Sequence, residues 1–273
     1  MPTIALTKCQ ATGNDFVLFD DRARSALPYP DLARQVCDRR FGIGADGLLV
    51  LAAADSPQAG IRMRIFNPDG SEAEMCGNGI RCVWLYLARE RVDGRPLDVQ
   101  TAAGVVRVEA DGPRNVRVEM GVPRIEAGAR EVESDGVRVQ FVAVSMGNPH
   151  AVVFVDRPLE GVALEQLAAC IARASGDAQV NVELVRPAAG RLDMRVHERG
   201  VGETWGCGTG ACAAAAVAIA SGRVRSPVDV VSKGGQVTVT WAGAGEPAYL
   251  SGPAQLVFST RIDVKAQAPP KTV

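Results

Sequence analysis

The 273-residue chain has almost no net charge and no long apolar run. Its 30 lysines and arginines stand against 31 aspartates and glutamates, so the charge balance gives no reason to expect nucleic acid or an anionic membrane as partner. The longest stretch of small apolar residues, Ala211–Ala220, falls well short of the roughly 20 residues that a membrane helix needs. Polar residues interrupt the start, Met1–Phe16, so it offers no signal-peptide core.

Low-complexity sequence is also missing, and 47% hydrophobic with 22% charged residues is the composition of a folded soluble protein. The seven cysteines are an odd number, widely scattered and without a Cys-x-x-Cys pair, which argues against a disulfide framework, a structural zinc site and a thiol oxidoreductase. We therefore expect reduced thiols in a cytoplasmic protein without metal. Away from the C-terminal tail the only lysines are Lys8 and Lys233, and neither has a recognisable Schiff-base setting, so we expect no pyridoxal phosphate.

One cysteine-bearing segment occurs twice, 131 positions apart. Residues 63–79 align without a gap on residues 194–210, sharing Met, Arg, Glu, Cys, Gly and Gly, and the same offset continues downstream. A duplicated half-chain predicts two similar lobes. We expect them at 1–123 and 124–260, with a crossing within Gly121–Ala129 and a return of the segment 261–273 to the first lobe.

Each half follows one plan. A Gly-Asn turn leads into an apolar strand, a helix (31–38; 164–174), short strands (61–66; 192–196) and the Cys-Gly-x-Gly segment. A strong helix then follows, amphipathic over 80–91 and apolar on every side over 211–221, before alternating strands with hairpin turns. This order predicts an α+β fold in which a curled, mainly antiparallel sheet wraps one central helix per lobe.

The chemistry is expected where Cys76-Gly77-Asn78-Gly79 and Cys207-Gly208-Thr209-Gly210 each precede a helix. First-turn amides lack helical partners and carry positive potential, which makes each loop suited to a carboxylate and should lower the pKa of its thiol. If the lobes face each other, one thiolate acts as base and the other thiol as acid on opposite faces of one carbon.

A cysteine is most often a small buried hydrophobe. That is our expectation for the other five, Cys9, Cys37, Cys82, Cys170 and Cys212. Packing alone does not explain why Cys76 and Cys207 recur with the same glycines in both copies.

Several polar residues accompany these loops at predicted strand ends or turns, namely Asn14, Asn67, Asn148, Asn181 and the pair Glu198-Arg199. Each asparagine could be an ordinary turn cap, and the charged pair a solvated one. Asn67 and Glu198 occupy equivalent repeat positions, which makes capping alone a poorer explanation. His150 could tune a thiol or be an ordinary hydrogen-bonded histidine.

Taken together, these motifs resemble diaminopimelate epimerases over nearly the whole chain. The segments that carry the resemblance are Gly13–Phe16, Phe41–Gly47, Asn67–Ser71, Met75–Gly79, Gly147–His150, Glu198–Gly200 and Cys207–Gly210. The resemblance implies two pseudo-symmetric lobes with the site in the cleft between them, and homodimerisation. It implies interconversion of LL- and meso-2,6-diaminoheptanedioate without cofactor or metal, on the route to lysine and peptidoglycan.

The resemblance also implies residue roles. Cys76 and Cys207 are its two acid/base residues, assisted by His150 and Glu198. Substrate contacts are implied for Asn14, Asn67, Asn148, Asn181, Glu198 and Arg199, and contacts to the reacting carboxylate for Gly77, Asn78, Gly208 and Thr209. Where some members have a glutamine that touches the substrate, this chain has Gly47.

Two alternatives stay open. A proline or hydroxyproline racemase of the same architecture would have no second amino acid end for Asn67, Asn181 and Arg199 to bind. A non-catalytic member of the fold or a thiol redox sensor is the alternative from another class. Retention of both cysteines argues against the former, and the absence of Cys-x-x-Cys against the latter.

Overall fold

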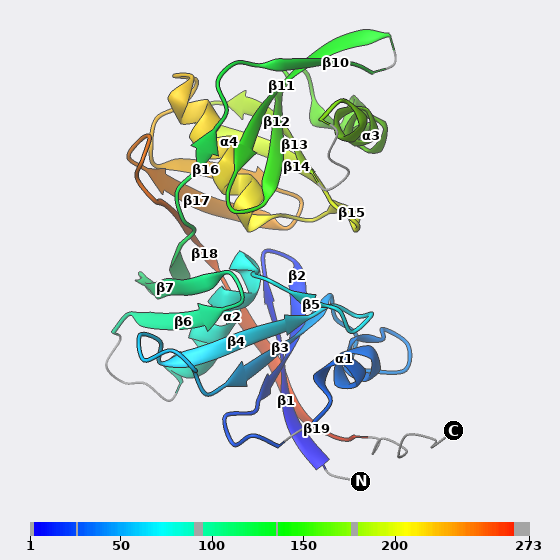
Figure 1. The fold of residues 1–273 in the computed structure, drawn as a ribbon, viewed down its shortest axis with the longest axis vertical. Coiled ribbons are helices and arrows are strands. Elements are labelled where there is room, and N and C mark those ends of the chain that lie inside the picture. Colours follow the sequence, from blue (N-terminus) through cyan, green and yellow to red (C-terminus); the bar gives the residue numbers. More distant parts are fainter. Residues whose placement is uncertain (1–2, 26, 90–94, 135, 176–179, 265–273) are drawn as a thin grey trace.

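The computed structural model describes residues 3–25, 27–89, 95–134, 136–175 and 180–264. Figure 1 shows two lobes of strands stacked along the long axis, with α1 and α3 on the outside of their lobes. Within these residues, no helix is long and apolar enough to cross a membrane.

The first lobe contains β1 (Thr3–Ala11), β2 (Asn14–Asp20), α1 (Tyr29–Cys37), β3 (Gly47–Ala52), β4 (Ile61–Phe66), β5 (Glu72–Ala73), α2 (Gly77–Ala88), β6 (Leu97–Thr101), β7 (Gly104–Asp111) and β8 (Asn115–Glu119). The chain continues with β9 (Arg124–Ile125), β10 (Arg130–Ser134), β11 (Val137–Ser145), β12 (Pro149–Phe154), a 3₁₀ turn (Leu159–Gly161), α3 (Leu164–Ser175), β13 (Asn181–Ala188), β14 (Arg191–Glu198), β15 (Gly202–Thr204), α4 (Gly208–Ala220), β16 (Val228–Ser232), β17 (Gly235–Trp241), β18 (Ala248–Pro253) and β19 (Gln255–Asp263).

The duplication in the sequence is a duplication of strand pairing. In the first lobe β2 pairs in parallel with β3, β3 antiparallel with β4, and β4 in parallel with β6. The strands β12, β13, β14 and β16 repeat this order in the second lobe. Even an ion pair recurs at equivalent positions, since Arg64–Glu72 and Arg195–Glu203 both have nitrogen–oxygen distances of 2.7 Å.

Strand pairings join the two lobes. Strand β9 follows β8 but pairs with β11, and on this basis we propose the crossing between the lobes within Gly121–Ala129. Strand β19 follows β18 but pairs with β1 along its whole length, and β8 and β18 pair with each other. The return to the first lobe therefore begins at Gln255, earlier than the expected residue 261, because the pairing of β19 with β1 starts there. We propose lobe boundaries near residues 123 and 253.

The central helices lie inside the rolled sheets. Helix α4 is buried on every side from Gly210 to Ala218, as expected from its composition. Helix α2 is more buried than the expected amphipathic pattern implies, because Gly77–Val83 are all buried, including Arg81 at 0% exposure. Its second half keeps a partly exposed side with Trp84, Leu85, Tyr86 and Ala88, whereas the sheet encloses α4 on every side. The expected end of α2 at residue 91 lies outside the described residues.

The small side chains of α4 let the second sheet approach the helix closely. Ala214 is fully buried there, whereas Ala220 is exposed at the end of the same helix. Extra methylenes in a close-packed interior force side chains off their rotamers. We expect Ala214→Leu to lower the free energy of unfolding by about 1–3 kcal/mol, measured by urea denaturation. The matched control Ala220→Leu should change it little, and equal losses in both variants would contradict this packing account.

Candidate active site

Two helix N-termini face each other where the lobes meet. Cys76 is the N-cap of α2 and Cys207 the N-cap of α4, and each sulfur accepts a hydrogen bond of 3.4 Å from the amide three residues on. A β-carbon built on Gly77 would lie 3.9 Å from the Cα of Gly208, so the backbones of the two first turns almost touch. The Cys-Gly-x-Gly segments are thus brought together, and both thiols are free and partly buried.

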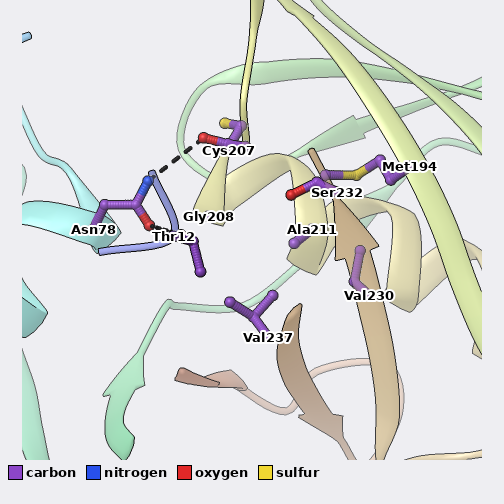
Figure 2. A pocket seen from close by; sticks show the side chains of 10 residues that line it. Thr12, Asn78, Met194, Cys207, Gly208, Ala211, Val230, Ser232 and Val237 are labelled. Atoms are coloured by element: carbon purple, nitrogen blue, oxygen red, sulfur yellow. Dashed lines mark hydrogen bonds between the residues drawn. The ribbon is translucent and has the colours of Figure 1, made fainter. Parts of the chain in front are cut away.

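Around Cys76 the polar groups come from β2 and α2. Asn14 Oδ1 lies 3.7 Å from Cys76 Sγ and accepts a 3.3 Å hydrogen bond from Asn78 Nδ2. The same amide donates to the carbonyl of Gly206 at 3.4 Å, which is a contact between the lobes. In Figure 2 it is the dashed line that runs from Asn78 towards Cys207.

The Asn78 side chain is itself held from behind. Its Oδ1 accepts hydrogen bonds from Thr12 Oγ1 at 3.3 Å and from Arg81 at 2.8 Å. Arg81 donates to backbone oxygens of Gly77 and Pro253 as well, so this fully buried cation is satisfied by neutral oxygens. Arg81 therefore fixes which way the Asn78 amide faces.

Around Cys207 the polar groups come from β12, β13 and α4. Thr209 Oγ1 lies 3.3 Å from Cys207 Sγ and accepts from Asn148 Nδ2 at 3.4 Å. Asn148 Oδ1 lies 3.0 Å from His150 Nε2, whose other ring nitrogen lies 2.7 Å from Glu183 Oε1. His150 thus reaches the thiol through two intermediates and does not contact it.

Glu198 is the charged group with the strongest electrostatic influence on Cys207. Its carboxylate accepts a hydrogen bond from the Thr204 hydroxyl, and burial raises the pKa of this carboxyl. Its sequence neighbour Arg199 has an exposed side chain, while its backbone amide donates to Asn181 Oδ1 at 3.1 Å.

The expectation that the helix termini lower the thiol pKa values is wrong for this structure. Burial raises the pKa of the Cys76 thiol, and the hydrogen bonds from Gly79 and Asn78 only partly offset it. Burial and the charges of Glu198 and Glu183 raise the pKa of the Cys207 thiol well above its usual value. Desolvation penalises the thiolate more than the helix ends favour it. Both thiols are therefore protonated at neutral pH.

Three further sequence candidates have their contacts away from the two thiols. Asn67 is exposed in a turn, where its amide donates to Ser71 Oγ at 2.9 Å. Asn181 is buried, and its amide donates to the carbonyl of Pro149 at 3.1 Å. Gly47 has no room for a side chain without a shift, because a β-carbon there would lie 3.1 Å from the Phe66 carbonyl.

Four residues near the thiols were not singled out from the sequence, namely Thr12, Arg81, Glu183 and Thr204. Thr12 and Thr204 lack a motif of their own. Arg81 and Glu183 look like solvated charges in the sequence, and only their burial, at 0% exposure each, marks them as site residues.

Comparison with known proteins agrees with this geometry. Residues 6–126 and 142–257 match the family model for diaminopimelate epimerase. The chain belongs to the diaminopimelate epimerase family. The diaminopimelate epimerase of Desulforudis audaxviator is 45% identical over 92% of this chain and 96% of its own, and that of Pelotomaculum thermopropionicum 43% identical over 93% and 96%. The chain is accordingly an enzyme, an isomerase.

Solved structures share the fold at low identity. A phenazine biosynthesis protein of the PhzF family from Bacillus anthracis superimposes with a TM-score of 0.75 at 18% identity, covering 97% of this chain and all of the other. A hydroxyproline epimerase from Agrobacterium vitis gives a TM-score of 0.70 at 16% identity, over 95% and 92%. The two-lobed architecture of this diaminopimelate epimerase family member is thus a known one.

Beside Cys207, a cavity of about 10 Å³ lies between the lobes of the epimerase chain (Figure 2). Thr12 and Asn78 line it from the first lobe, and Gly206, Cys207 and Ser232 are among those that line it from the second. Its volume suits one water molecule. An amino acid does not fit there, so this cavity is not the place of a substrate.

The raised thiol pKa values predict how alkylation depends on pH. The thiolate is the reactive species, so its fraction should rise roughly tenfold per pH unit below the pKa. We expect iodoacetamide to label Cys76 and Cys207 at rates that still climb at pH 9, measured by timed labelling and peptide mapping. A plateau below pH 8 at either cysteine would mean that the helix N-terminus outweighs burial.

Proposed function

We propose that the chain interconverts LL- and meso-2,6-diaminoheptanedioate by moving a proton between the two faces of one α-carbon, without pyridoxal phosphate or metal. The observation that carries this is the pair of thiols on facing helix N-termini. One carbon between them would have a proton acceptor on one face and a donor on the other.

In this mechanism the first-turn amides bind the reacting carboxylate. The backbone N–H groups of Gly77, Asn78, Gly208 and Thr209 converge from both helices with the positive ends of two macrodipoles. One cysteine thiolate takes the α-proton, and negative charge moves onto the carboxylate that these amides hold. The opposite thiol then donates its proton to the other face, so the thiol and the thiolate have exchanged places. A thiolate with a raised pKa is the stronger base for this step.

The distal amino acid end of the substrate is assigned to Asn67, Asn181 and Arg199, with Asn14, Asn148 and Glu198 nearer the reacting carbon. Arg199 has an exposed guanidinium suited to a carboxylate, and Asn181 retains one amide hydrogen after its bond to Pro149. A proline-sized substrate would leave these groups unfilled. In this proposal the space for the substrate arises when the lobes move apart. The proposed setting of the reaction is lysine and peptidoglycan synthesis in the cytoplasm.

Proton NMR in deuterated water tests the substrate and the reaction together. We expect purified protein to incorporate solvent deuterium at the α-carbon of LL-diaminopimelate and to form the meso isomer. Activity should be unchanged by a chelator and by added pyridoxal phosphate. Exchange with proline or 4-hydroxyproline in place of diaminopimelate would overturn the assigned substrate class.

Single cysteine variants test the two proton carriers. Cys76→Ala and Cys207→Ala should each abolish epimerisation with the fold intact, because each face needs its own proton carrier. Cys170→Ala, which changes a partly buried cysteine on the outer helix α3, is the matched control and should stay active. Full activity of Cys76→Ala or Cys207→Ala in the same NMR assay would rule out the two-base mechanism.

We propose further that the chain forms a homodimer through β19. Val257 and Phe258 are 51% and 49% exposed on this strand. Val257 is the extra residue of a β-bulge, since Lys8 pairs with Phe258 and Cys9 with Leu256. Adjacent exposed apolar side chains of this kind are typical of a protein contact.

Sedimentation of a charged variant tests the dimer. Phe258→Asp should give a monomer, because a carboxylate would be buried in the contact. Phe41→Asp changes a side chain that is 91% exposed on a loop and should leave the dimer intact. A monomeric wild-type protein, or dissociation of both variants, would argue against a dimer contact at β19.

A further inference from the structure

A buried pair of a histidine and a carboxylate lies behind Cys207. His150 on β12 and Glu183 on β13 both have side chains that are 0% exposed, with 2.7 Å between Nδ1 and Oε1. Glu183 lies directly under the first turn of α4, because a β-carbon on Gly210 would come within 2.5 Å of its Oε1. The other carboxylate oxygen, Oε2, has no hydrogen-bond partner among the described residues, so His150 is the group that compensates this charge.

The duplication provides an internal comparison for this pair. His150 lies opposite Asn181 in the β12–β13 ladder, as Phe16 lies opposite Gly47 in the β2–β3 ladder. The same offset makes Leu49 the counterpart of Glu183, and a β-carbon on Gly79 would meet Leu49 Cδ2 at 2.9 Å. Two apolar side chains thus fill these positions in the first lobe. Packing the helix against the sheet does not require an ion pair.

The pair is connected to Cys207 by an unbroken chain of contacts. His150 Nε2 lies 3.0 Å from Asn148 Oδ1, and Asn148 Nδ2 donates to Thr209 Oγ1 at 3.4 Å. Thr209 Oγ1 in turn lies 3.3 Å from Cys207 Sγ. Four contacts therefore lead from the Glu183 carboxylate to the sulfur.

In the structure both ring nitrogens of His150 face oxygens that accept, a carboxylate on one side and the amide oxygen of Asn148 on the other. A ring with a hydrogen on each nitrogen, an imidazolium, satisfies both acceptors. Thr209 already accepts from Asn148, which leaves its own hydroxyl hydrogen to donate to Cys207 Sγ. A donor at the sulfur favours the thiolate over the thiol.

The same side chains can also form a complete set of hydrogen bonds in the opposite direction. If His150 lost the proton on Nε2, a rotated Asn148 amide would donate to that nitrogen and accept from Thr209. The Thr209 oxygen would then accept from the S–H group of Cys207. The hydrogen bonds can therefore run in two directions: in one, Thr209 donates to a Cys207 thiolate, and in the other, the Cys207 thiol donates to Thr209. The charge of His150 selects between them.

We propose that Glu183 is a positioning residue that holds His150 as an imidazolium, so that Thr209 donates to Cys207 Sγ. This rests on the proposed role of Cys207 as a proton carrier, although Glu183 itself contacts no substrate. Glu198, on β14, is a further titratable group that faces both Cys207 and His150.

Imidazole NMR tests the charge state without any assay of activity. The chain has two histidines, so ¹H–¹⁵N spectra of the rings are assigned with a single His197→Gln variant. At neutral pH we expect both ring nitrogens of His150 to be protonated in the wild type and only one in Glu183→Gln. A neutral His150 in the wild-type protein would overturn the proposal.

Alkylation tests the effect on the sulfur. In Glu183→Gln we expect labelling of Cys207 to slow about tenfold at fixed pH, the loss of roughly one hydrogen bond to a charged group, with Cys76 unchanged. If Glu183 acted only as a negative charge beside the thiol, labelling of Cys207 would instead speed up. Glu203→Gln, which changes an exposed carboxylate paired with Arg195, is the matched control and should alter neither cysteine.

A double variant guards against a failure to fold. His150→Phe with Glu183→Leu installs the pair that the first lobe already uses, so we expect it to fold and to show the same slowing at Cys207. With diaminopimelate, both variants should lower kcat and leave KM unchanged. Equal changes at both cysteines, or a rise in KM alone, would overturn the positioning role. The NMR and labelling experiments use no substrate, so they test the positioning role whether or not the substrate is diaminopimelate.

Discussion

The approach of two helix N-termini is the constraint on which the rest of the molecule depends. The first turns of α2 and α4 nearly touch through Gly77 and Gly208, and both ends carry positive potential. Two such ends repel each other unless negative charge lies between or beside them. Glu183 and Glu198 provide it in the second lobe, at the expense of the acidity of Cys207. A carboxylate or a thiolate between the helices would complete the compensation, which supports the proposed binding of the reacting carboxylate at this junction.

Holding two helix ends together requires lobes that do not drift apart freely. Pairing of β19 with β1 makes the first rolled sheet incomplete without the end of the chain, and the pairing of β8 with β18 joins both lobes into one hydrogen-bonded system. A separation of the lobes that kept these pairings would bend the chain at the crossings, since losing the pairing would leave strand edges unsatisfied. The Asn78 contact to Gly206 is the weaker link, a single long hydrogen bond that movement can break.

The fold was predictable because duplication and periodicity are local in sequence. The repeat identified two lobes, the alternating segments identified strands such as β4 at its observed bounds, and the composition of α4 identified a buried helix. The exchange of β19 and the burial of Arg81 were not predictable, because both depend on which segments the rolled sheet encloses. The two helix-capping cysteines followed from their motif. Their raised pKa values did not, because desolvation is a property of the assembled interior.

Differences between the two copies assign different environments to the two thiols. Behind Cys76 lies a buried cation, Arg81, whose equivalent in the second lobe is Cys212. Behind Cys207 lies the pair of His150 and Glu183, where the first lobe has apolar side chains. In the proposed reaction LL- and meso-diaminopimelate differ at the reacting carbon only in which face carries the proton, and a symmetric site would treat both faces alike. The duplicated backbone would then provide the opposed geometry, and the unequal groups behind each helix would set how readily each thiol gives or takes its proton.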